Sequence, residues 1–262
     1  MKTIALLTDF GLSDNFAGVM KGVILKINSR LRLVDITHKV TAHDIAAAAF
    51  LLKGSYKYFP KGTIFLVVVD PGVGSKRRPI IIRSKNYLFV GPDNGALEPA
   101  ACADGIREIV AIENKSYFLK PLSGTFHGRD IFAPVAAYLS KGKKPNVFGR
   151  PLNSLKQSGI PSPEVSKDIL KGEVVYIDRF GNLVTNIDEA LFKRFRRNSN
   201  RRFKIKIKDT KINSLAGSYE AVRPGKPLAI FGSFGLLEIS VNKDSAEKHF
   251  RAKRGLAVKI LL

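Results

Sequence analysis

The stretch VVVDPGVGSKRRPIII, residues 67–82, decides how this chain folds. An apolar run ends at Asp70, a loop containing Pro71, Gly72 and Gly74 follows, and a second apolar run begins after three basic residues. Apolar runs without polar alternation are typical of strands buried on both faces, as in parallel sheets covered by helices. The stretch therefore predicts two core strands joined by a polar loop, with a carboxylate at the end of the first.

Strand-like and helix-like segments alternate on both sides of this stretch. Such alternation predicts an α/β fold in which helices cover both faces of a largely parallel sheet. The strands are expected at residues 3–11, 31–40, 62–72 and 106–113, with a hairpin at 79–93, and the helices at 13–29, 43–59, 94–103 and 128–142.

The amino-acid composition changes after about residue 141, where a segment rich in Gly, Pro, Ser and Lys extends to residue 165. Such composition is typical of a connection between domains. Beyond it, short apolar runs separated by glycine-containing turns predict a small antiparallel β-barrel. We therefore expect an N-terminal α/β domain at residues 1–160 and a C-terminal β-barrel domain at residues 161–262.

Composition narrows the classes of protein to which this chain can belong. Its 262 residues are 45% hydrophobic, which is enough for a large core, and no apolar run approaches the length of a membrane span. The single Cys102 excludes an intramolecular disulfide and a cluster of thiolate metal ligands. These features predict a cytoplasmic protein without a membrane partner.

The net charge of +22 raises nucleic acid as a partner. The densest basic run, residues 193–211, holds ten Lys or Arg and only Asp209 in opposition. Within it, RRFKIKIK alternates basic and apolar residues, which is the period of a strand with one face in water. A solvated face is the simpler interpretation, and loose, salt-sensitive nucleic-acid binding stays as an alternative.

Polar residues follow several of the predicted strands, where ligands bind in open α/β sheets. Asp9 follows the first strand, Asp70 the third, and Asp93 and Asn94 the hairpin. Each alone is an ordinary turn or helix-cap residue. Together they indicate a ligand site at the carboxyl edge of the sheet.

His127 is the histidine best suited to proton transfer, because it stands between Phe126 and Gly128 directly before a predicted helix. The alternative is a capping or packing role. The chain has neither an HExxH motif nor a GxxxxGK[ST] loop, which argues against a catalytic zinc and against a nucleoside triphosphatase. We expect neither a metal nor a cofactor.

A further signal lies in the second domain, in the segment YIDRFGNLVTN. Asp178, Phe180 and Asn182 alternate, so a strand running into a turn at Gly181 would send all three toward one face. A hairpin alone explains Gly181 and Asn182. It explains Asp178 less well, because a carboxylate within an apolar strand needs a partner.

Six motifs taken together resemble the S-adenosyl-L-methionine hydroxide adenosyltransferase family, which is related to halide-using enzymes that attack the same substrate. The resemblance covers nearly the whole chain in order. The motifs are LLTDFGLSDNFAGVMKG, VVVDPGVGSKRRPI, FVGPDNGAL, TFHGRDIFAPVAA, IDRFGNLVTNI and SFGLLEISVN.

The resemblance implies that water attacks the ribose C5′ of S-adenosyl-L-methionine, giving adenosine and L-methionine. It assigns Asp70, Arg77 and His127 to the catalytic set; adjacent Arg78 leaves the arginine open, and either Asp70 or His127 could take the proton. It also implies a homotrimer whose active sites lie between the first domain of one subunit and the second domain of its neighbour. The substrate-binding positions that it assigns are Asp9 at the ribose hydroxyls, Phe126 in the pocket wall, Asp178 at the methionine ammonium, Phe180 and Asn182 at the adenine, and Ser233 at the methionine carboxylate.

Two departures from the halide-using relatives favour water as the nucleophile. This chain lacks their short insertion between Asp178 and Phe180, and it keeps Asp70 where they have an uncharged residue. A sulfonium is already a good leaving group, so the reaction needs neither a general acid nor a metal. The alternatives are a halide-using adenosyl transferase and a basic nucleic-acid-binding or adenosine-binding protein without turnover.

Overall fold

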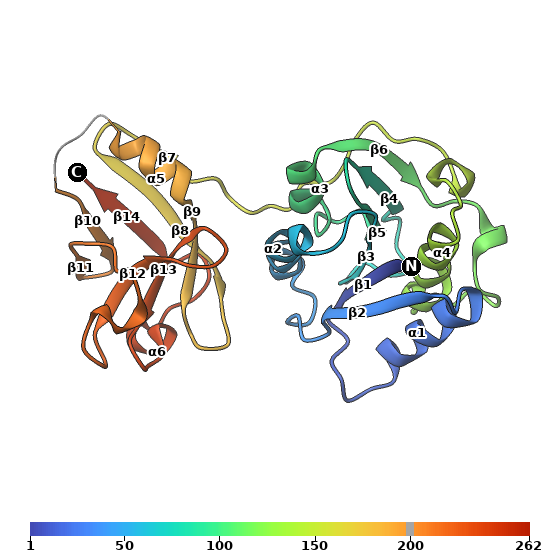
Figure 1. Cartoon of the computed structure of the whole chain (residues 1–262), viewed down its shortest axis with the longest axis horizontal. Coiled ribbons are helices and arrows are strands. Elements are labelled where there is room, and N and C mark those ends of the chain that lie inside the picture. The colour runs from blue at the N-terminus through green and yellow to red at the C-terminus, as the bar shows by residue number, and fades with distance from the viewer. Residues whose placement is uncertain (198–201) are drawn as a thin grey trace. The chain divides into compact units, whose positions relative to one another are not determined.

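The computed structural model describes residues 1–197 and 202–262, which form two compact units, residues 1–159 and 160–262. Each unit is described by itself (Figure 1). Part of the basic run predicted at residues 193–211, namely residues 198–201, lies outside the described residues. No helix in the described part of the chain is both long and apolar enough to cross a membrane.

The first unit is built on a six-stranded sheet with the order β2-β1-β3-β5-β4-β6. The four strands β2, β1, β3 and β5 are parallel, whereas β4 runs antiparallel to both of its neighbours, β5 and β6. The hairpin expected at 79–93 is therefore confirmed as β4 and β5. The strands are β1 (Lys2–Thr8), β2 (Leu31–Thr37), β3 (Ile64–Val68), β4 (Pro79–Ser84), β5 (Leu88–Pro92) and β6 (Ile106–Ala111).

Helices cover both faces of this sheet, as predicted (Figure 1). Helix α1 packs against α4 on one side, and α2 packs against α3 on the other. The helices are α1 (Phe16–Ile27), α2 (Ile45–Ser55), α3 (Glu98–Asp104) and α4 (Ala133–Ser140), with a π-helical turn, η3 (Gly128–Phe132), directly before α4. Single 3-10 turns are η1 (Tyr56–Tyr58), η2 (Lys115–Tyr117) and η4 (Pro145–Phe148).

The middle of the sheet explains why the opening stretch lacks polar alternation. Every residue of β3 is buried, because helices lie over both of its faces. At Gly91 of β5, an added Cβ would lie 2.4 Å from the carbonyl oxygen of Val67, so only glycine allows the two strands to approach here. The apolar run thus accounts for the burial of the whole strand, and Asp70 stands two residues after the end of β3.

The second unit is an antiparallel sheet in the order β11-β10-β14-β8-β9-β13-β12, with β7 added beside β8. The segment after β11 reaches β12 through a bridge between Leu215 and Ala229, so the sheet nearly closes into the predicted barrel. The strands are β7 (Glu164–Val165), β8 (Ile169–Ile177), β9 (Leu183–Asp188), β10 (Lys204–Ile207), β11 (Thr210–Ile212), β12 (Pro227–Phe231), β13 (Leu236–Val241) and β14 (Ala257–Leu261).

Alternating burial confirms the strand period that was read from the basic run. Ile205 and Ile207 of β10 are buried in the core of the unit, whereas Lys204 and Lys206 are exposed. The helices α5 (Glu189–Arg196) and α6 (Ala246–Phe250) and the 3-10 turn η5 (Tyr219–Ala221) were not expected. Helix α5 overlaps the start of the basic run by its last four residues, 193–196, and buries Phe192 just before them.

Candidate active site

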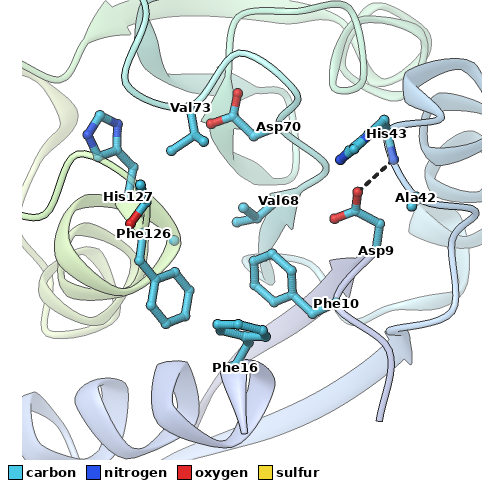
Figure 2. A pocket seen from close by; sticks show the side chains of 12 residues that line it. Asp9, Phe10, Phe16, Ala42, His43, Val68, Asp70, Val73, Phe126 and His127 are labelled. Atoms are coloured by element: carbon cyan, nitrogen blue, oxygen red, sulfur yellow. Dashed lines mark hydrogen bonds between the residues drawn. The ribbon is translucent and has the colours of Figure 1, made fainter. Parts of the chain in front are cut away.

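A pocket of about 260 Å³ lies at the carboxyl edge of the first sheet, where β1 and β3 end. Figure 2 shows Asp9, Asp70 and His127 around it, with the rings of Phe10, Phe16 and Phe126 grouped at one end. The sequence-predicted residues Asp9, Asp70, Phe126 and His127 thus share one pocket. Its other lining residues are Ala42, His43, Val68, Val73, Thr125 and Gly128.

Asp70, Arg77 and His127 form one hydrogen-bonded cluster. Nε of Arg77 donates to Oδ1 of Asp70 at 3.0 Å and to Oδ2 at 2.9 Å. Nη2 of Arg77 donates to Oδ2 of Asp70 at 2.5 Å and lies 2.8 Å from Nδ1 of His127. The side chains of Asp70 and Arg77 are 5% and 10% exposed, so this ion pair is shielded from bulk water.

The contact with Arg77 determines the tautomer of His127. A guanidinium can only donate, so Nδ1 of His127 must offer its lone pair, and the ring proton belongs on Nε2. The backbone of Ser123 provides a hydrogen bond for the ring. Burial and the Arg77 charge lower the pKa of His127 below its ordinary value of 6.5, against the raising effect of Asp70 and Asp130. Neutral imidazole is therefore the form that fits this cluster.

The cluster is held where two loops meet. An added Cβ at Gly74, whose φ is +76°, would lie 2.5 Å from the carbonyl oxygen of Gly124, so only glycine fits. The Arg77 guanidinium also lies over the ring of Phe132 in η3, 5.3 Å from its centroid. Backbone contact and a cation–π contact therefore both fix the loop of Asp70 against the segment of His127.

A buried acid, Asp130, orders the segment around His127. Its Oδ2 accepts a hydrogen bond from the backbone N–H of Ser123 at 2.8 Å, and its Oδ1 accepts one from Nε of Arg129 at 2.6 Å. The guanidinium of Arg129 in turn lies over the ring of Phe126, 5.2 Å from its centroid. Asp130 does not line the pocket; it orders the segment that carries His127, and its charge raises the pKa of that histidine.

Asp9 lies on the opposite side of the pocket from His127 (Figure 2). Its Oδ2 accepts a hydrogen bond from the backbone N–H of His43 at 2.8 Å. His43 takes a left-handed conformation with φ of 66°, which turns this N–H toward Asp9. The other carboxylate oxygen, Oδ1, has no hydrogen-bond partner among the described residues and can accept hydrogen bonds from the hydroxyl groups of a ligand in the pocket.

The two adjacent arginines have different partners. Arg78 pairs with Asp93 and also donates to the carbonyl oxygen of Ser154 at 3.2 Å, whereas Arg77 pairs with Asp70. Asp93 accepts the backbone N–H of Lys156 at 2.8 Å as well. Asp93 follows the end of β5 but does not line the pocket. Together with Arg78, it instead holds residues 154–156 in place by hydrogen bonds.

The other four predicted binding residues lie in the second unit, around a pocket of about 700 Å³. Asp178, Phe180, Asn182 and Ser233 all line it. The ring of Phe180 is 78% exposed, which is unusual for an aromatic side chain at the rim of a cavity. Further lining residues are Val184, Tyr219, Phe234, Glu238, Val241, Lys243, Asp244 and Ser245.

The expectation that Asp178 stands in an apolar strand was wrong. Strand β8 ends at Ile177, and residues 178–182 form the turn into β9. The Asp178 carboxylate accepts the backbone N–H groups of Phe180 at 2.8 Å and Asn182 at 2.9 Å, together with the side-chain amide of Asn182. An Asp that bonds the N–H groups two and four residues on is a turn-former, so local hydrogen bonds supply the partner that was missing in the sequence interpretation.

Sequence reasoning missed several residues that line these pockets. Phe10 and Phe16 belong to motifs that were quoted, but nothing in their spacing distinguishes a pocket wall from a core. In the second unit, buried Glu238 accepts hydrogen bonds from the Tyr219 hydroxyl and Ser240. Burial and this carboxylate raise the pKa of Tyr219 to about 12. The pairing joins residues 19 positions apart, which no local pattern reveals.

No group of three or more His, Cys, Asp or Glu side chains in the described ranges, 1–197 and 202–262, could hold a metal ion. At the first pocket the structure brings together a paired carboxylate, a guanidinium and a neutral imidazole. Such a set can orient a water molecule and accept its proton.

Two family models match the chain, one for each unit. Residues 4–149 match the SAM hydroxide adenosyltransferase N-terminal domain, and residues 172–259 match the C-terminal domain of the same family. A protein of Thermus thermophilus named (R)-S-adenosyl-L-methionine hydrolase is 34% identical, with all of both chains covered. A protein of Methanocaldococcus jannaschii with the same name is 35% identical over 94% of this chain and 90% of its own length.

More distant relatives carry another name. A protein of Actinoplanes named fluorinase is 28% identical over 70% of this chain and 71% of its own length. Among solved structures, an uncharacterized conserved protein from Thermotoga maritima superposes with a TM-score of 0.91 at 38% identity, covering 99% of this chain and 100% of its own. These likenesses extend over both units.

Proposed function

Because this chain belongs to the S-adenosyl-L-methionine hydroxide adenosyltransferase family, we propose that it hydrolyses S-adenosyl-L-methionine to adenosine and L-methionine. The family predicted from the sequence is thereby confirmed. Curated relatives at 34% and 35% identity that are named hydrolases support the choice of water as the nucleophile. The observation that carries the proposal is the cluster of Asp70, Arg77 and His127 beside a pocket that also contains Asp9.

At the ribose carbon, the reaction forms one bond and breaks one. The water oxygen attacks C5′ of the ribose, the C5′–S bond breaks, and its electron pair goes to sulfur, which becomes the neutral thioether of methionine. The water loses one proton to the protein or to solvent. As the water gives up its proton, its oxygen becomes hydroxide-like, and this developing negative charge cancels the positive charge on sulfur. A pocket that excludes bulk water therefore lowers the barrier, provided that the reacting water is held in line.

Within the cluster we assign the proton to Asp70. Nδ1 of His127 is occupied by Arg77, and its other ring nitrogen carries a hydrogen, so the neutral ring has no free lone pair. Oδ1 of Asp70 accepts only the Nε–H of Arg77 within the described protein and keeps capacity for a water. Arg77 then positions Asp70, and His127 positions Arg77.

The pockets offer negative charge to a cationic substrate even though the chain carries +22. The second pocket is lined by Asp178, Glu238 and Asp244 against a single Lys243. Salt screens the surface lysines beyond about 8 to 10 Å, so nearby carboxylates dominate. In this second pocket, Asp178 would bind the methionine ammonium and Ser233 would bind the methionine carboxylate, whereas Phe180 and Asn182 would contact the adenine. In the first pocket, Asp9 would bind the ribose hydroxyls and Phe126 would form part of the wall.

A homotrimer with active sites shared between subunits stays a prediction, as does a cytoplasmic location. In such an assembly a neighbouring subunit could cover Phe180, which is 78% exposed, and burial of its ring would be favourable. Light scattering on the purified protein would give the mass of the assembly. The proposal of hydrolysis does not depend on its outcome.

The decisive experiment is to incubate the pure protein with S-adenosyl-L-methionine in water enriched in oxygen-18 and to separate the products by chromatography. We expect adenosine that carries the heavy oxygen at its 5′ hydroxyl. A parallel incubation with added chloride or fluoride tests the halide-using alternative. If 5′-haloadenosine forms faster than adenosine, or if neither forms above the blank, the hydrolase proposal fails.

Substitution of the cluster tests the site assignment. Asp70→Ala and His127→Ala should each reduce turnover by at least about a hundredfold, because the first removes the base and the second removes the partner that positions Arg77 against that base. Calorimetric titration with S-adenosyl-L-methionine should show that binding survives, since neither residue is assigned to a substrate group. An unchanged rate in either variant would remove that residue from the catalytic set.

A further inference from the structure

Four lysines stand in one row across the second unit. Antiparallel pairing places Lys211 of β11 opposite Lys206 of β10, Lys206 opposite Lys259 of β14, and Lys259 opposite Lys171 of β8. These residues are up to 88 positions apart in the chain, and only the register of the sheet brings them into line. Nothing in the proposed hydrolysis uses them.

The row faces outward from the barrel. On the same strands, the neighbouring positions Ile205, Ile260 and Leu170 are fully buried in the core, so the lysines point to the other side. Lys206, Lys211 and Lys259 are exposed, and Lys171 is partly exposed. With neighbouring strands about 4.8 Å apart, the row is about 14 Å long.

Little on the protein compensates this charge. Lys171 pairs with Glu164 of β7 at 3.1 Å, at one end of the row. The other three lysines make no ion pair with any residue in the described ranges. Apart from Glu164, the nearest acids by register and sequence are Glu173 and Asp209, and each is two positions along the chain from a lysine of the row. Like charges directly opposite one another on a sheet are unfavourable, so the fold tolerates a repulsion that an external anion would relieve.

We propose that this lysine row binds the phosphodiester backbone of a nucleic acid without reading its sequence. A series of cations placed one strand apart matches the repeated negative charges of a polyanion, and Lys204 adds a further charge on the same face of β10. The positions that flank the row on this face, which include Leu261, Ile169 and Ala257, carry no aromatic side chain of the kind that anchors a protein in a lipid interface. The observations therefore favour nucleic acid over an anionic membrane.

Fluorescence anisotropy tests the proposal with a labelled DNA duplex of about 20 base pairs and a labelled single-stranded RNA of about 20 nucleotides, titrated with the whole chain. Four phosphate contacts predict that affinity for the duplex falls about a hundredfold between about 50 and about 200 mM salt. In the double variant Lys206→Gln/Lys259→Gln, the slope of log K against log salt should become shallower by about two.

A matched control removes two exposed lysines from the first unit, Lys141→Gln/Lys143→Gln, and should leave the slope unchanged. Equal losses in both double variants would mean that only the net charge matters and would overturn the proposal. Absence of binding at about 50 mM salt, or binding to phosphatidylserine vesicles but to neither nucleic acid, would also overturn it. Hydrolysis of S-adenosyl-L-methionine by Lys206→Gln/Lys259→Gln should match the unsubstituted protein, which separates this test from that of the proposed function.

Discussion

At the scale of single residues, the contact between Arg77 and Nδ1 of His127 links the protonation state of the histidine to the geometry of the cluster. If His127 takes up a proton, both partners become donors and the contact is lost. Burial and the charge of Arg77 oppose that protonation by lowering the pKa of His127 below 6.5. The cluster is therefore built to remain intact at neutral pH.

This linkage predicts the acid side of the pH profile. As pH falls below 6.5, the unfolded chain protonates His127 before the folded chain does, so the folded state loses stability in this interval. Turnover should fall with a midpoint below 6.5, where the folded protein takes up that proton. Steady-state rates between about pH 4.5 and 8, combined with an NMR titration of the His127 ring, give both values.

The variant Arg77→Gln provides the control for this titration. Without the guanidinium charge, the pKa of His127 should rise, because only burial then opposes the raising effect of Asp70 and Asp130. The His127 signal can be assigned by its disappearance in His127→Ala. A midpoint at or above 6.5 in the unsubstituted protein would contradict the prediction.

The neighbouring arginines offer a matched pair of substitutions. Arg77→Lys should lower kcat by at least about tenfold, because a single ammonium nitrogen lacks the planar fork of donors that spans Asp70 and Nδ1 of His127. Arg78→Lys changes the same chemistry one residue away, but its partner is Asp93, outside the pocket. We expect kcat for Arg78→Lys to stay within about threefold of the unsubstituted enzyme. The reverse order would assign the catalytic role to Arg78.

At the scale of elements, the π-helical turn η3 holds the pocket wall and the cluster together. It begins immediately after His127, it carries Phe132 under Arg77, and it buries Asp130 completely. The extra residue of a π-helical turn shifts the direction of the side chains that precede α4. His127 and Phe126 thereby lie at the pocket while α4 packs into the core.

Asp130 should therefore matter for stability more than an exposed acid does. Asp130→Ala removes the acceptor of the Ser123 N–H, and loss of a hydrogen bond to a buried charged group costs about 2 to 3 kcal/mol. For a unit of this size, Tm should fall by about 4 to 10 °C in a calorimetric scan. Glu164→Ala is the control, because its side chain is 74% exposed and the loss should stay within about 0.5 kcal/mol. Similar losses in the two variants would refute the assigned role of Asp130.

At the scale of the whole molecule, the proposed substrate contacts divide between the two units. Asp9, Asp70, Phe126 and His127 line a pocket of the first, whereas Asp178, Phe180, Asn182 and Ser233 line a pocket of the second. The predicted homotrimer would combine these sets from different subunits. The predicted domains, residues 1–160 and 161–262, would then each contribute half of every site.

Mixed assemblies test this sharing. Subunits with Asp70→Ala and subunits with Asp178→Ala, expressed together in equal amounts, should recover about a quarter of the native activity, since random assembly leaves about a quarter of shared sites with both residues intact. Each variant expressed alone should be nearly inactive. Sites contained within one subunit would give no recovery, because every subunit would lack one of the two residues.

The sequence was enough to predict three features: the burial of β3 on both faces, the position of Asp70 after it, and the antiparallel strands of the second unit. These features depend on the local period of apolar residues, which reflects burial on one face or on two. The turn at residues 178–182 shows the limit of that reasoning, because Asp178 continues an apparent alternation but bonds the N–H groups of its own turn. Alternation alone does not distinguish a strand residue from a turn residue that hydrogen-bonds locally.

By itself, the sequence determined the α/β unit, the barrel, the family and the candidate residues, because each is expressed in short patterns or in motifs that a resemblance can match. Only the tertiary structure paired Arg77 with Asp70 and Arg78 with Asp93, placed Nδ1 of His127 against a donor, and aligned four lysines across four strands. The physical reason is that hydrogen bonds and charge interactions act over a few ångströms in space. Which distant residues come that close depends on loop geometry and strand register, and neither is written in the local pattern.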